Sequence, residues 1–378
     1  MANNPTLTEA ARRVEALRGK HLQVGLYPNP VVGYIGEEMG NDGRGGQQGF
    51  FVGQQIVTAG KLGWNRSVVS REIDAAEHEW AMQRLRVVND VHSAAHRVIA
   101  AQRTVTLCEQ LLRIGEEGVK VAEQLFSAQE VSRVDVLQTR IEANSARLQL
   151  QKANNSLVAE WRSLATLAGT PDLQPSIVEA PIESQFSPLD WNLSLTQLLA
   201  ESPERMRASA ELERARAAVC QARAGRYPDI DVEAGVRYNL ASNDTLATAA
   251  VALPLQIYNR NQGNIRQTWA ELAAAQQNLR RVELALEDRL AAEYRHYSDA
   301  RETVARYRDS IVPDADSALQ LVREGYRQGE FGYLDLLTAQ QTYFRAHLAM
   351  VDALRDAQIS RIRIDGLLLS GGLTSPCE

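Results

Sequence analysis

The feature that most constrains this chain is that two short segments, far apart from each other, both recur at one spacing. Tyr27-Pro28-Asn29 recurs 200 residues later as Tyr227-Pro228-Asp229. Val134-Asp135-Val136-Leu137 recurs at the same offset as Leu334-Asp335-Leu336-Leu337. Two matches that share one offset are hard to obtain by chance, so we interpret the chain as a tandem duplication. Its fold must therefore be built from two similar halves.

The halves are expected to contain the same elements in the same order, in a fold that is mainly α with a small β part. Each opens with a short helix. The first repeat, 1–168, is then expected to hold a hairpin at about 29–57, a long helix at about 61–126 and a return helix at about 131–168. The second, 204–370, is expected to hold a hairpin at about 229–257, a long helix at about 262–326 and a return helix at about 333–370. An irregular, Pro-rich connector at 169–203 separates the repeats, and 371–378 form a tail.

The expected hairpin of the second half alternates between polar and apolar residues. On its first strand, Asp231, Glu233 and Arg237 point one way, whereas Val232, Val236 and Tyr238 point the other. One face is therefore wet and the other apolar, which suits a membrane β-barrel with a polar lumen and lipid outside. A soluble, half-buried hairpin gives the same pattern, so alternation alone leaves both open. The expected strands of the first half alternate poorly.

The stretches that follow the hairpins carry no strand signals. At 1.5 Å per residue, about 65 residues make a helix about 100 Å long, which exceeds an ordinary globular domain. Pro313 should kink or briefly break the second of these helices. The first return helix has a heptad-like seam of Val134, Leu137, Ile141 and Leu148, interrupted by polar residues. Such a mixture indicates a wall of helices with water on both sides rather than a dry coiled coil.

Charge and cysteine usage exclude several classes of protein. The net charge is −6, with acidic and basic residues interspersed, which argues against a nucleic-acid-binding surface. Cys108, Cys220 and Cys377 are far apart, so we expect neither a disulfide framework nor a zinc site. We find no run of 18 apolar residues that would predict a transmembrane helix, and no export signal.

No catalytic, cofactor or metal site is expected. His92 and His96 stand one helical turn apart and could share a metal ion, but Ser93 replaces the glutamate of a HEXXH motif. A solvated helix face is the simpler interpretation of these histidines. The glycine-rich segment 43–49 lacks the Lys-Ser/Thr ending of a phosphate-binding loop and fits a hairpin turn. The sequence therefore predicts neither an enzyme nor a resident cofactor.

The segment from Leu321 to Gln340 resembles the helix–turn–helix signature of the TolC-like outer-membrane efflux protein family. The matching positions are Tyr326, Gly329, Leu334, Asp335, Leu337 and Gln340. The duplicated layout of nearly the whole chain is similar to the same family. A shorter likeness to its heavy-metal (cobalt-zinc-cadmium type) branch lies in Tyr27-Pro28-Asn29-Pro30, Gly53-Gln54-Gln55-Ile56 and Gly60-Lys61.

This resemblance implies an outer-membrane channel of a Gram-negative bacterium, a passive exit duct in a tripartite efflux system, with metal cations among the candidate substrates. It implies a homotrimer in which each protomer gives four strands to a twelve-stranded β-barrel surrounded by outer-membrane lipid. The long helices would form an α-helical barrel in the periplasm, where a periplasmic adaptor protein and an inner-membrane pump dock. Members are exported by an N-terminal signal, and many carry a lipidated cysteine. The alternative is a soluble coiled-coil scaffold or periplasmic adaptor that binds partners through long helical hairpins.

The resemblance also assigns roles at the two turns between long and return helices. Asp335 and Asp135 are candidates for a ring of carboxylates at the channel entrance, where such rings favour cations. Thr338 belongs to the same candidate gate, at a position where some relatives carry a second acid. Both aspartates also begin helices, whose dipole favours acids, so a capping role is the competing interpretation. Candidates for the periplasmic tip and partner docking are Tyr326, Gly329, Glu330, Leu334, Phe126 and Glu130. For Tyr326 and Phe126, core packing is the favoured interpretation.

Overall fold

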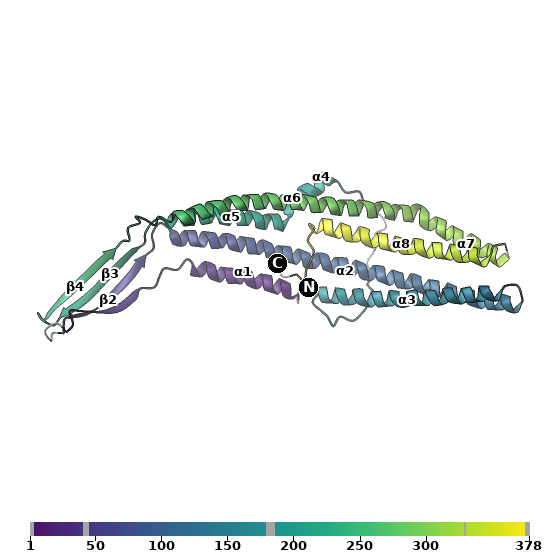
Figure 1. The fold of residues 1–378 in the computed structure, drawn as a ribbon, viewed down its shortest axis with the longest axis horizontal. Helices are drawn as coiled ribbons and strands as arrows, with labels where there is room; N and C mark the ends of the chain where they lie inside the picture. Colours follow the sequence, from purple (N-terminus) through teal and green to yellow (C-terminus); the bar gives the residue numbers. More distant parts are fainter. Residues whose placement is uncertain (1–3, 41–44, 179–185, 329, 375–378) are drawn as a thin grey trace. The chain divides into compact units, whose positions relative to one another are not determined.

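The computed structural model describes residues 4–40, 45–178, 186–328 and 330–374. They are mainly helical and include one four-stranded antiparallel sheet, so the expected fold class is confirmed (Figure 1). They fall into two compact units. The strand unit comprises Ala10–Trp80 and Pro203–Glu283, and the helical unit comprises Met1–Glu9, Ala81–Ser202 and Leu284–Glu378.

The elements follow the same order in each half of the sequence. The first half contains α1 (Pro5–Gln23), β1 (Val31–Glu37), β2 (Gln47–Ile56), α2 (Lys61–Ser127) and α3 (Arg133–Leu167). The second half contains α5 (Pro203–Ala224), β3 (Ile230–Asn239), β4 (Asp244–Ala252), α6 (Gln262–Arg306), the π-helical turn η2 (Tyr307–Ile311), α7 (Val312–Gln328) and α8 (Tyr333–Asp365). A further helix, α4 (Trp191–Glu201), lies between them.

The sheet of the strand unit combines both hairpins. Its order is β1-β2-β3-β4, and every neighbouring pair is antiparallel. β2 of the first half pairs with β3 of the second along their full lengths, from Gln47 opposite Asn239 to Ile56 opposite Ile230. Backbone hydrogen bonds therefore join the two halves, and β1 and β4 form the edges of the sheet within one chain.

The two faces of this sheet differ in charge. Residues directly opposite each other on neighbouring strands share a face, so the register assigns each side chain to one of the two. One face, here called the wet face, carries all five charged residues of the four strands: Glu37, Asp231, Glu233, Arg237 and Asp244. The other, here called the apolar face, carries Val32, Tyr34, Phe50, Val52, Ala234, Val236, Tyr238, Ala247, Ala249 and Val251. The alternation expected for 231–238 is thus present. The first hairpin alternates poorly, as expected, because Ile35 and Phe51 share the wet face while Gln48 and Gln54 share the apolar face.

The two long helices differ in continuity. α2 is one helix of 67 residues, which makes it about 100 Å long. In the second half, α6 gives way to η2, in which Val312 N–H bonds to Tyr307 C=O, five residues back. Pro313 follows at once, and a proline ring clashes with the carbonyl four residues earlier in a regular α-helix. The irregularity expected at Pro313 therefore lies in the preceding turn, as a π-helical widening.

The connector is not wholly irregular, so the expectation for 169–203 is wrong over α4. This helix forms because Asp190 caps it, with Oδ1 accepting from Leu193 N–H at 2.7 Å. Leu198 is buried, and Trp191 packs edge-on against Tyr294 of α6, with ring centroids 5.6 Å apart. These contacts hold the end of the connector on the helical unit.

The return helix α8 ends five residues before the expected position 370. Leu367 and Leu368 have left-handed backbone, with φ of 58° and 60°, which cannot continue an α-helix. The segment that follows lies against α2 instead. The Asn89 amide donates to the carbonyls of Gly366 and Leu369, both at 2.8 Å, so this buried side chain satisfies two backbone acceptors.

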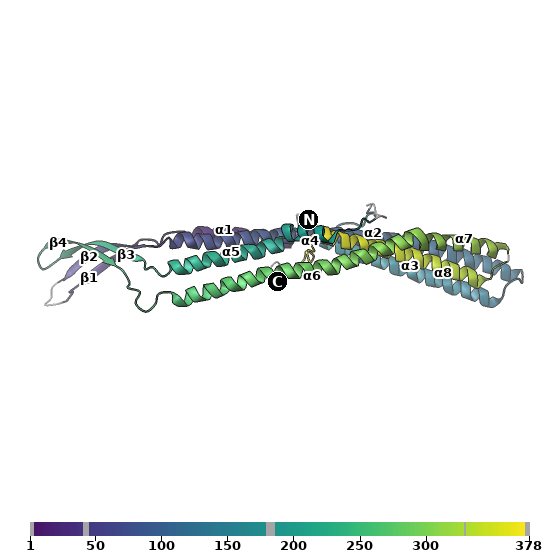
Figure 2. The same cartoon turned by 90° about the horizontal axis from the view of Figure 1, so that it is seen from above.

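Alanine, valine and leucine side chains build most of the core of the helical unit. Its clusters are Ala94, Val98, Trp161 and Leu164, and Val304, Ala353, Leu354 and Ala357. In both views α3 runs beside α2, and α8 beside α7 (Figures 1 and 2). The apolar seam of α3 stays exposed in the single chain, at Val134, Leu137, Ile141 and Leu148. Across the described residues, every helix is too short or too polar to traverse a bilayer.

Candidate functional site

Two turns of the helical unit carry the residues that the sequence singles out. One joins α2 to α3, the other joins α7 to α8, and they lie at the same end of the helical unit (Figure 1). Both helices end with the same bond: Glu130 N–H donates to Leu125 O at 2.9 Å, and Glu330 N–H donates to Gly325 O at 2.8 Å. This is the Schellman pattern of helix C-termini. Its recurrence 200 residues apart is what a duplication predicts.

The two aspartates that follow these turns cap the return helices. Asp135 Oδ2 accepts from Ser132 N–H at 2.9 Å and from the Ser132 hydroxyl at 2.8 Å, and that hydroxyl accepts from Asp135 N–H at 3.3 Å. Asp335 Oδ2 accepts from Gly332 N–H at 3.0 Å, and the glycine has no side chain to complete a reciprocal pair. Capping is therefore a property of both residues, and a gating role for them stays a prediction.

A pair of tyrosines flanks the turn between α7 and α8. Tyr326 of α7 and Tyr333 of α8 meet edge to face, with ring centroids 6.5 Å apart. Burial, together with the negative charge of Asp135, raises the pKa of Tyr326. Burial, with Glu142 and Asp135 nearby, raises the pKa of Tyr333 to about 12. The capping carboxylate of the first turn thus acts electrostatically on the tyrosines of the second, and both hydroxyls stay protonated at neutral pH.

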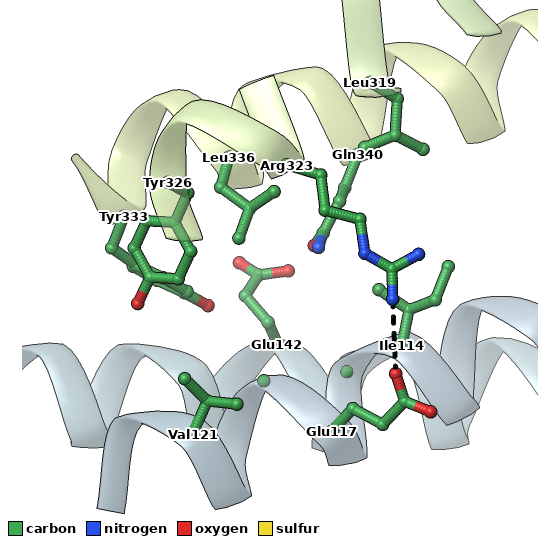
Figure 3. Close-up of a pocket in the computed structure, with 12 residues that line it drawn as sticks. Ile114, Glu117, Val121, Glu142, Leu319, Arg323, Tyr326, Tyr333, Leu336 and Gln340 are labelled. Carbon is green, nitrogen blue, oxygen red and sulfur yellow. Dashed lines mark ion pairs between the residues drawn. The ribbon is translucent and has the colours of Figure 1, made fainter. Parts of the chain in front are cut away.

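A pocket of about 160 Å³ lies between the α2–α3 hairpin and the α7–α8 hairpin, and both tyrosines line it (Figure 3). Figure 3 shows the Glu142 carboxylate pointing from α3 toward Leu336. On the other side of the pocket, Arg323 of α7 pairs with Glu117 of α2 at 3.7 Å. Both of these side chains are about half exposed, so the pair is a weak, salt-sensitive link between the hairpins.

The chain matches one protein family over nearly its whole length. The family model described as outer membrane efflux protein matches residues 1–170 and 194–368. The chain belongs to the outer membrane efflux protein family. This efflux protein is thus an outer-membrane channel component of an efflux system that extends into the periplasm of a Gram-negative bacterium. The expected family, function and location are confirmed, and the soluble scaffold is not the class that matches.

Individual relatives agree with this assignment. The efflux protein is 27% identical to the cobalt-zinc-cadmium resistance protein CzcC of Cupriavidus metallidurans over 367 residues, which cover 97% of this chain and 87% of CzcC. It is 24% identical to the nickel-cobalt-cadmium resistance protein NccC of Alcaligenes xylosoxydans xylosoxydans over 288 residues, 75% of this chain and 65% of NccC. A crystal structure of CusC shares the fold, with a TM-score of 0.81 at 19% identity, covering 98% of this chain and 90% of that one.

The other residues assigned by sequence lie in or beside the turns of the efflux protein. Leu334, Glu130 and Glu330 are exposed, as a docking surface requires. Phe126 is also exposed, so the packing role considered for it is not fulfilled within one chain. Thr338 donates its hydroxyl to the Leu334 carbonyl at 2.8 Å, which binds it to its own helix. Gly329 lies outside the described residues.

Sequence reasoning missed Glu117, Glu142, Arg323 and Tyr333 of this efflux protein. Arg323 and Tyr326 are three residues apart on α7, so helical periodicity could have placed them on one face. Tyr333 precedes Asp335 by two residues and belongs to the same family-like segment. Nothing in the sequence indicates that Glu117 and Glu142, on the α2–α3 hairpin, face α7 and α8, because that depends on how the hairpins pack.

Proposed function

We propose that three copies of this chain assemble into one passive duct that exports metal cations. Each copy would give four strands to a twelve-stranded barrel in the outer membrane, and the long helices would continue as a tunnel through the periplasm. A periplasmic adaptor and an inner-membrane pump would bind at the helical turns. The duct would catalyse no reaction, because the pump delivers the substrate and supplies the energy.

The sheet carries this proposal. Its apolar face is exposed and has no charge, which suits contact with lipid, whereas its wet face suits a water-filled lumen. Four strands leave β1 and β4 as edges with unpaired backbone groups, and such edges are not tolerated in lipid. Pairing β4 of one copy with β1 of the next removes the edges, and three copies close the ring.

The relatives and the charge of the wet face support metal cations as the cargo. CzcC is named for resistance to cobalt, zinc and cadmium, and NccC for resistance to nickel, cobalt and cadmium. On the wet face of each copy, four carboxylates accompany one arginine. A water-filled path lined by excess carboxylates concentrates cations without binding them at a fixed site.

The decisive experiment combines assembly, conduction and resistance. The protein purified from membranes in detergent should have the mass of a trimer and form cation-preferring channels in planar bilayers. A strain lacking the gene should become sensitive to cobalt, zinc or cadmium, and the intact gene should restore resistance. A monomer that conducts no ions would contradict the duct. A conducting trimer whose loss alters no metal sensitivity would contradict the cargo alone.

We also propose that the two helical turns form a closed resting entrance, which the Arg323–Glu117 pair helps to hold. Replacing Glu117 by arginine places two like charges together, so single-channel conductance in planar bilayers should rise. The exchanged double variant, Glu117→Arg with Arg323→Glu, restores opposite charges and should return the conductance toward the starting value. Because the pair is half exposed, its direct contribution is only about 0.2–1 kcal/mol, and the increase should shrink in 1 M salt. Equal conductance in all variants would place the closure elsewhere.

A further inference from the structure

The wet face of the sheet contains one ion pair among its five charged side chains. Arg237 Nη1 of β3 lies 2.6 Å from Glu37 Oε2 of β1. These strands are not neighbours, because β2 runs between them. The pair therefore crosses a complete strand.

A glycine makes this crossing possible. Gly49 of β2 lies directly opposite Arg237, and a Cβ at position 49 would overlap the carbonyl oxygen of Val236. Because Gly49 has no side chain on the wet face beside Arg237, the guanidinium can reach across β2 to Glu37. The Arg237 side chain is only 19% exposed, and its Nε has no hydrogen-bond partner among the described residues. Glu37 is thus the group that holds the arginine in place.

The Glu37–Arg237 pair lies at a different depth of the sheet from Asp231 and Glu233. The helices of the strand unit join the sheet beside Val31, Ile56, Ile230 and Ala252, which all lie at one end. Asp231 and Glu233 are near that end, whereas Glu37, Arg237 and Asp244 are near the other. Glu233 and Arg237 are four positions apart along β3, which corresponds to about 13 Å. This distance exceeds the Debye length of about 8 Å at physiological ionic strength. The two groups of charges therefore act nearly independently on ions.

We propose that Arg237 neutralises Glu37 at the outer mouth of the duct and so lowers the negative charge there, so that exported cations are retained less than Glu37 and Asp244 together would retain them. The inference rests on the proposed trimeric barrel, in which the helices mark the periplasmic side and the pair lies at the external side. Asp231 and Glu233 of three copies then form the acidic, cation-concentrating zone further in. Three Glu37 carboxylates without their arginines would add to the three Asp244 carboxylates at the exit, and the larger negative charge would hold divalent cations and favour their return.

Planar bilayers can test this with the assembled channel. Arg237→Gln should raise the permeability ratio of K⁺ over Cl⁻ on the order of twofold in 0.1 M KCl, where the Debye length is about 10 Å, and much less in 1 M KCl. Zn²⁺ added to the external side should block this variant at lower concentration than it blocks the original channel. Glu37→Gln leaves the arginine unpaired, so it should lower the permeability ratio of K⁺ over Cl⁻ and raise the Zn²⁺ concentration needed for block.

The matched controls separate the effect of charge on ion selectivity from the effect of each substitution on the structure. Arg237→Lys keeps the positive charge and should not increase Zn²⁺ block, and the double variant Glu37→Gln with Arg237→Gln should return the permeability ratio toward its starting value. If the original channel conducts but both single variants leave selectivity and block unchanged, this inference is overturned while the duct stands. If the original protein forms no channel, the proposed function fails first.

A second measurement tests the charge at position 37 if the Arg237 and Glu37 variants above do not assemble. In a chain whose other cysteines are replaced, Glu37→Cys can be labelled after assembly with a positively or a negatively charged methanethiosulfonate. The positive label should lower the cation preference, and the negative label should restore it. Absence of any change after complete labelling would show that position 37 does not act on the ion path.

Discussion

Replacing Val236 by arginine should cost the assembled channel about 2–4 kcal/mol if this residue lies near the middle of the membrane. Val236 lies between the middle of β3 and the end that carries Arg237, its side chain is 56% exposed, and its neighbours across the sheet are Phe50 and Ala247. An arginine there would place a charge on the face that has none. The oligomer should dissociate at lower temperature in detergent, which gel electrophoresis without boiling measures directly, and less of it should reach the outer membrane.

Gln47→Arg is the matched control, because Gln47 lies on the neighbouring strand with its side chain on the wet face. The same substitution should be tolerated there, since water and Glu37 are available to the new charge. If both variants lose stability equally, the sheet has no lipid-facing side. If neither does, the apolar face is solvated or covered by protein.

Replacing Asp135 or Asp335 by alanine should destabilise the turns and open the resting entrance. Each lost hydrogen bond contributes about 0.5–1.5 kcal/mol. Asp135→Ala should therefore lower the unfolding free energy more than Asp335→Ala, because the carboxylate of Asp135 accepts two bonds and that of Asp335 accepts one. Removing either carboxylate also weakens the negative field at the entrance, so planar bilayers should show higher conductance with a weaker cation preference.

Asparagine variants distinguish the two contributions. Asp135→Asn and Asp335→Asn keep an oxygen that accepts from the turn but remove the charge. If the carboxylates act through their field, asparagine should reduce cation preference as much as alanine does, with a smaller loss of stability. Unchanged conductance and selectivity in all four variants would leave the aspartates as helix caps and place the gate elsewhere.

The sequence predicted most of the elements, because the signals for them are local. The repeated Tyr-Pro segments and the segments around Asp135 and Asp335 located both hairpins and both turns, and the stretch without strand signals before Phe126 corresponds to α2. Features that depend on packing were missed. Helix α4 relies on Trp191 meeting Tyr294 from a distant part of the chain, and the pairing of β2 with β3 relies on two hairpins meeting.

The residues of the candidate site were likewise found where their signals are local and missed where their contacts depend on packing. Asp135 and Asp335 were found because their immediate neighbours repeat, and the competing capping role was found from their place at the start of a helix. No local signal in the sequence indicates that Arg323 and Glu117 pair with each other, because their proximity depends on how two hairpins pack. The Glu37–Arg237 pair is hidden for a similar reason: 200 residues separate its members, and only the sheet register brings them together.

The pairing of β2 with β3 has a consequence for how the duct is made. In the proposed trimer, half of the contacts between successive hairpins are formed inside single polypeptides, and the other half join separate molecules. Because one chain carries both hairpins, their pairing is an intramolecular step that does not depend on the concentration of the protein. The internal contacts can therefore form in each newly exported molecule before it meets another. Dependence on protein concentration is confined to the contacts between copies, and the duplication halves the number of such contacts in the closed ring.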